Sequence, residues 1–64
     1  MNHELAEELL EKLKVGELSE VVVSKEDFLT FRENLVKRPD FKHFHGNAQH
    51  GGVIIYTYLQ EARS

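Results

Sequence analysis

Cysteine and tryptophan are absent from this 64-residue chain, and proline occurs once. Without cysteine, disulfide bridges and the thiolate-containing zinc sites of small domains are excluded. The longest apolar run, residues 53–55, is far too short to span a bilayer. The acidic N-terminal region also lacks the basic and apolar segments of a signal peptide. We therefore expect a soluble cytoplasmic protein with no membrane partner.

The chain length predicts a single domain, residues 1–64, and such a small domain buries only about 60% of its unfolded surface. The apolar fraction of 41% is nevertheless that of a globular protein. Because disulfides are excluded, a compact core or a partner subunit must supply the stability. We expect a homo-oligomer, most simply a dimer, or a complex with another protein.

Negative charge is concentrated in the first part of the sequence. Residues 1–27 contain eight acids and three bases, a net of −5, whereas residues 28–64 contain three acids and five bases, a net of +2. A net charge of +2 is smaller than the positive charge that most nucleic-acid-binding domains carry on their binding surface. The acids are most simply the solvated face of a helix, and nucleic-acid binding by the second part remains the alternative.

The segment HELAEELLEKLK, residues 3–14, predicts an amphipathic helix. Leu5, Leu9 and Leu13 recur every four residues and form an apolar stripe. Asn2 is a suitable N-cap, and Gly16 supplies the C-terminal stop.

A strand and a second helix are expected next. The β-branched run at residues 18–24 predicts the strand, and residues 25–36 predict the helix, with Ser24 as its cap. Pro39 prevents the helix from continuing. The expected inner side of this helix comprises Phe28, Leu29, Phe31, Leu35 and the aliphatic stem of Arg32.

Residues 41–59 predict a β-hairpin, which completes the order α-β-α-β-β. This order favours a small two-layer α+β sandwich, in which a three-stranded, mainly antiparallel sheet with a C-terminal hairpin packs on two helices. A Gly51-Gly52 turn suits the positive φ angles of tight hairpins. It predicts that Ala48 lies opposite Ile55 and that Phe44, Ala48 and His50 face the helices.

The opposite side of the hairpin then becomes a polar and aromatic face. This predicted interaction face comprises His43, His45, Asn47, Gln49, Ile54, Tyr56 and Tyr58. The assignment depends on register, because a slip of one residue turns every side chain of a strand to the other side. Gly46 could mark a bulge, and an extended loop at residues 46–52 is the competing possibility.

Tyrosine is enriched at protein interfaces, so the face suggests a function. The sequence predicts a small non-enzymatic regulatory or protein-interaction module that acts as a homodimer through this face. The alternative is a nucleic-acid-binding regulator that uses the hairpin face and the basic residues Arg32, Lys37, Arg38 and Lys42.

Catalytic and metal chemistry receive little support. The serines lack a Ser-His-acid context, and we expect no catalytic residue, cofactor or small-molecule substrate. In a regular strand His43 and His45 share one side while His50 lies on the other, so the three do not form a ligand set. No metal site is predicted, and a metal-responsive protein is the third hypothesis.

Overall fold

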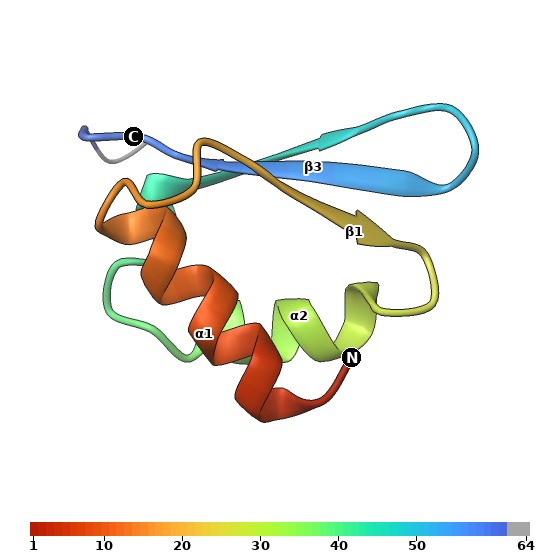
Figure 1. Ribbon diagram of the computed structural model, residues 1–64, viewed down its shortest axis with the longest axis horizontal. Helices are drawn as coiled ribbons and strands as arrows, with labels where there is room; N and C mark the ends of the chain where they lie inside the picture. The colour runs from red at the N-terminus through yellow and green to blue at the C-terminus, as the bar shows by residue number, and fades with distance from the viewer. Residues whose placement is uncertain (62–64) are drawn as a thin grey trace.

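The computed structural model describes residues 1–61 and contains two α-helices and three strands. In chain order these are α1 (His3–Lys14), β1 (Val21–Ser24), α2 (Phe28–Val36), the short 3-10 helix η1 (Phe41–His43), β2 (Phe44–Ala48) and β3 (Val53–Tyr58). Both helices lie on one side of the sheet (Figure 1). The predicted α+β order and two-layer arrangement are confirmed.

Helix α1 begins and ends where the sequence predicts. The Asn2 side-chain oxygen accepts a hydrogen bond from the Leu5 backbone N–H at 2.7 Å, which satisfies a donor that lacks an intrahelical partner. Gly16 follows the helix with a φ of +82°, a left-handed conformation that favours glycine. The buried positions are Ala6, Leu10 and Leu13, so the apolar stripe is rotated away from the half-exposed Leu5.

Helix α2 starts three residues later than predicted. Ser24 Oγ donates to Asp27 Oδ2 at 3.1 Å, and the Asp27 N–H donates to the Ser24 carbonyl at 3.1 Å, so residues 24–27 form a turn. Ser24 is therefore not the cap of this helix, and the expectation was wrong. Phe31 is fully buried as predicted, but Leu29 is 68% exposed and belongs to the outer side.

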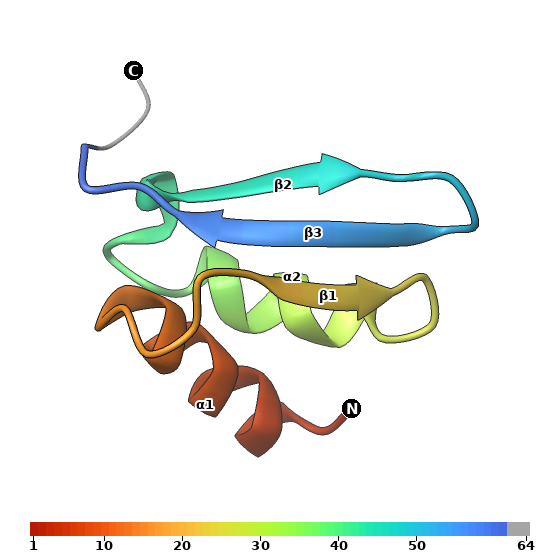
Figure 2. The same ribbon diagram turned by 45° about the horizontal axis from the view of Figure 1, so that its top comes forward.

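The sheet has the strand order β1-β3-β2, and both neighbouring pairs are antiparallel. Figure 2 shows β3 in the centre, with β1 and β2 at the two edges. The core between sheet and helices comprises Ala6, Leu10, Leu13, Val21, Val23, Phe31, Phe44 and Tyr56. No described element crosses the other side of the sheet (Figures 1 and 2).

Neither helix could cross a membrane: within residues 1–61, no helix has the length and apolar character that a bilayer span requires.

Candidate functional site

The hairpin has a register that differs by one residue from the predicted one. Gly46 pairs with Tyr56, and Asn47 pairs with Ile55, in an uninterrupted ladder without a bulge. The Gln49 N–H donates to the Val53 carbonyl at 2.8 Å, which leaves a three-residue loop at residues 50–52. Gly51 and Gly52 both have positive φ, so the turn is where the sequence places it but is one residue longer.

The slip of one residue exchanges the two sides of β3. Tyr56 is only 5% exposed and its ring centroid lies 4.7 Å from that of Phe31, so its placement on an open face was wrong. Burial raises the pKa of the Tyr56 hydroxyl, and the positive charge of Arg32 partly opposes this shift. Ile54 and Tyr58 also pack against the core.

Gly46 explains why this register is favoured. A Cβ atom at Gly46 would lie 2.9 Å from Tyr56 Cε1, so only glycine allows the tyrosine ring to lie beneath the strand. Such a pairing of glycine with a cross-strand aromatic residue is a known means of covering a weak strand position. The presence of Gly46 in one strand and Tyr56 in the other is the sequence signal that could have identified the correct register.

An aromatic stack closes the end of the hairpin next to η1. The rings of His43 and Tyr58 are parallel within 11°, with centroids 5.2 Å apart, and Phe44 meets Tyr58 edge-on at 5.0 Å. His43 Nδ1 lies 2.8 Å from the Leu59 carbonyl, to which its N–H can donate. His43 and Tyr58 thus belong to the packing at the start of β2, away from an open face.

The exposed side of the sheet carries a different set of residues from the predicted one. His45, Asn47 and Gln49 are exposed, and on β1 Val22 is 57% exposed between two buried valines. Because Ile55 pairs with both Val22 and Asn47, it shares their side. We call this set the outer sheet face; it comprises Val22, His45, Asn47, Gln49, Val53, Ile55 and Thr57.

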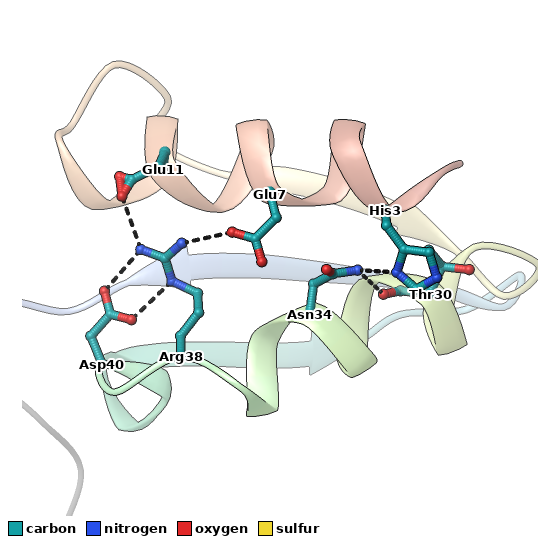
Figure 3. A network of polar contacts seen from close by, with 7 residues as sticks. All are labelled: His3, Glu7, Glu11, Thr30, Asn34, Arg38 and Asp40. Atoms are coloured by element: carbon teal, nitrogen blue, oxygen red, sulfur yellow. Dashed lines mark hydrogen bonds and ion pairs between the residues drawn. The ribbon is translucent and has the colours of Figure 1, made fainter.

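The predicted basic cluster is broken up by acidic partners of Arg38 (Figure 3). Arg38 Nε lies 2.9 Å from Asp40 Oδ1, Nη1 lies 3.2 Å from Glu7 Oε2, and Nη2 lies 3.1 Å from Glu11 Oε1. The Arg38 side chain is 12% exposed, and its guanidinium lies 5.8 Å from the Phe44 ring centroid. Arg38 therefore joins α1 to the end of α2.

These contacts weigh against the predicted role of Arg38 as a nucleic-acid contact, because phosphates would have to displace three carboxylates. The hydrogen bond from Arg38 also holds the pKa of the Asp40 carboxyl below its ordinary value. Arg32, Lys37 and Lys42 are exposed, which for Arg32 differs from its predicted place on the inner side of α2.

Two further polar contacts, neither of them predicted from the sequence, link the N-terminal segment to the rest of the chain. The amide of the buried Asn34 donates to His3 Nδ1 and to the Thr30 carbonyl, both at 2.8 Å (Figure 3). The Met1 ammonium lies 2.8 Å from Asp27 Oδ1. It is the main reason why the pKa of Asp27 is lowered. These contacts are specific to the tertiary structure, and no local pattern indicates them.

The three hairpin histidines are not brought together. His43 is in η1, and His45 is on the outer sheet face. His50 is exposed in the hairpin loop, so the prediction that it faces the helices was wrong. Among residues 1–61, no group of three or more His, Cys, Asp or Glu side chains is arranged to hold a metal ion.

Comparison with known proteins places the chain in a family. No curated protein and no solved structure matches the chain. The family model described as YkzS-like protein matches residues 3–57. This match runs from the start of α1 almost to the end of β3, and the chain therefore belongs to the YkzS-like protein family.

Proposed function

We propose that the chain is a non-enzymatic protein-interaction module that forms a homodimer through its outer sheet face. The observation that carries the proposal is an uncovered sheet surface whose centre is apolar. Val22 is 57% exposed, and its neighbours Ile55 and Val53 lie on the same side without any described helix over them. An exposed apolar sheet surface in a small domain is typical of an interaction site.

The charge distribution favours a second copy as the partner. Charged residues make up 30% of the chain, yet the outer sheet face contains no Asp, Glu, Lys or Arg. Two copies can therefore approach through this face without like-charge repulsion, although the whole chain has a net charge of −3.

The arrangement of the face suits sheet-on-sheet packing. Facing sheets pack at about 10 Å through interdigitated apolar side chains, which here would be Val22, Val53 and Ile55. His45, Asn47 and Gln49 at the margin of the face can form the polar rim of such an interface. A standard interface buries about 800 Å² of each partner, which is a large share of the 4518 Å² total surface. We therefore expect a reversible dimer at the weak end of specific association.

Sedimentation equilibrium over a range of concentrations tests the proposal. The wild-type protein should approach twice the chain mass, and Val22→Lys should remain monomeric because a lysine from each copy would enter the interface. Lysine is well tolerated on an edge strand, so the fold should be retained. The matched control is Leu29→Lys, because Leu29 is at least as exposed as Val22 but lies on α2, in the other layer. A monomeric wild type at millimolar concentration, or an unchanged dimer of Val22→Lys, would contradict the proposal.

No specific observation favours the nucleic-acid alternative. Of the four basic residues that it requires, Arg38 is held by carboxylates of Glu7, Glu11 and Asp40.

A further inference from the structure

Strand β2 leaves a row of backbone groups without partners in the sheet. The Gln49 N–H donates to Val53, and the Leu59 N–H donates to His43, so the odd-numbered residues of β2 direct their backbone groups toward β3. The N–H and C=O groups of Gly46 and Ala48 therefore point away from the sheet. Both residues are exposed, and because Gly46 has no side chain and Ala48 only a methyl group, neither shields this edge.

A shallow apolar pocket of about 220 Å³ lies beside the same stretch of β2. Its lining comes from the hairpin, from Lys25 and from Phe28 at the start of α2, and Figure 1 shows that the hairpin extends beyond the start of this helix. The lining residues are Lys25, Phe28, Ala48, Gln49, Gly52, Val53 and Ile54. Small-molecule sites usually have volumes of about 300–1,000 Å³, so this pocket suits one apolar side chain better than a cofactor.

The edge and the pocket together have the features of a strand-addition site. When an extended peptide pairs with an exposed edge, backbone hydrogen bonds provide affinity and pockets for alternate side chains provide specificity. A peptide residue opposite Ala48 would direct its side chain to the same side of the sheet as Ala48, because paired residues share a side. On that side lies the apolar pocket.

The charge around the edge indicates which peptides fit. Residues 41–60 contain no Asp or Glu, but include Lys42 and three histidines. Lys25 adds a positive charge at the margin of the pocket. A second copy would bring its own Lys25 and Lys42 to this edge, so an acidic peptide is the better partner.

We infer that the β2 edge binds an extended segment of a partner protein, with one apolar side chain in the pocket and acidic residues on either side of it. The inference rests on the proposed role as an interaction module. Gln49 and Val53 contribute to both surfaces, but the β2 edge and the Ala48 side of the pocket lie outside the dimer face. The two proposals can therefore fail separately: the dimer is judged by the measured mass, and the peptide site by the amide chemical shifts of Gly46 and Ala48.

The test is a titration of ¹⁵N-labelled protein with acetylated hexapeptides, followed by amide chemical shifts. The first peptide, Glu-Thr-Leu-Thr-Val-Glu, carries an apolar anchor and acidic ends. In the other two, alanine replaces the leucine, or lysines replace both glutamates. The first peptide should shift the Gly46 and Ala48 amides and bind at least tenfold more tightly than either of the others. Absence of these shifts at millimolar peptide, or equal binding of all three peptides, would overturn the inference.

Two variants separate this site from a general effect on folding. Ala48→Pro removes an N–H that points away from the sheet, a position where an edge strand tolerates proline, and should abolish peptide binding while the dimer mass is unchanged. Lys25→Glu should reduce binding of the acidic peptide, whereas Lys37→Glu, a control with the same charge change on an exposed residue outside the pocket lining, should leave that binding closer to wild type. If Ala48→Pro instead abolishes the dimer, a second copy occupies the edge and the inference is wrong.

Discussion

Gly46→Ala tests the observed register through one methyl group. The added Cβ would lie 2.9 Å from Tyr56 Cε1, closer than real Cβ contacts, and 3.2 Å from Tyr56 Cζ, which is tighter than most of them. The ring has little room to move, because Tyr56 is 5% exposed and the Phe31 ring lies behind it at 4.7 Å. Inserting a group into a packed core costs about 1–3 kcal/mol. Alanine recovers about 0.5–1 kcal/mol through the lower entropy of its unfolded chain.

The net expectation is a loss of about 1–2 kcal/mol in the free energy of unfolding, measured by urea denaturation with circular dichroism. In the register with Gly46 opposite Thr57, the same change would meet no ring and would be neutral or stabilising. The double variant Gly46→Ala with Tyr56→Leu provides the control, since removal of the ring should relieve the added cost. A stabilised Gly46→Ala, or equal effects with and without the tyrosine, would refute the close approach.

Three further predictions concern the polar contacts between the helices. Arg38→Ala should lower the free energy of unfolding by about 2 kcal/mol, chiefly because it removes charge-assisted hydrogen bonds to the partly buried Asp40, whereas the exposed Arg32→Ala should change it by less than about 0.5 kcal/mol. Because the pKa of Asp40 is lowered in the folded state, its contribution is present above the ordinary value of 3.8 and is lost as the pH falls through the folded pKa. Asp40→Asn should therefore flatten the fall in stability below about pH 4 in urea titrations at several pH values; an unchanged slope would contradict the ion pair. His3→Ala should cost about 1 kcal/mol by removing an acceptor from the buried Asn34 amide, and a neutral result would show that this contact is not formed.

The elements of this fold are local in origin, and the sequence therefore predicts them well. Asn2, the leucine repeat and Gly16 define α1 through contacts within one or two turns. The order of elements and the hairpin with glycines at its turn follow in the same way. The start of α2 was misplaced because Ser24 and Asp27 form a turn with each other, and a capping pattern and such a turn have similar residue types.

The prediction of which β3 side chains face the core was wrong for a different reason. A hairpin loop of two residues and one of three residues satisfy the same pair of glycines, and the difference of one residue moved Tyr56 from an open face into the core. What selects the longer loop is the contact between Gly46 and Tyr56, a packing relation across ten positions of the chain. Likewise, the sequence does not indicate that Arg38 is paired, because Glu7 and Glu11 lie beside it only in the tertiary structure.

The proposed dimer makes Val22 and Ile55 central to function, although neither was singled out from the sequence as exposed. They are apolar residues of the kind that usually lie in a core, and only the topology shows that their side of the sheet is uncovered.

The most direct measurement is an isotope-filtered NOE experiment on an equimolar mixture of ¹³C-labelled and unlabelled protein, which detects contacts between copies only. If the outer sheet faces pack together, intermolecular cross-peaks should connect the methyl groups of Val22, Val53 and Ile55 with those of the partner copy. Cross-peaks from the exposed Leu29 methyls on α2, or no cross-peaks at a concentration where the mass is that of a dimer, would contradict the proposed interface.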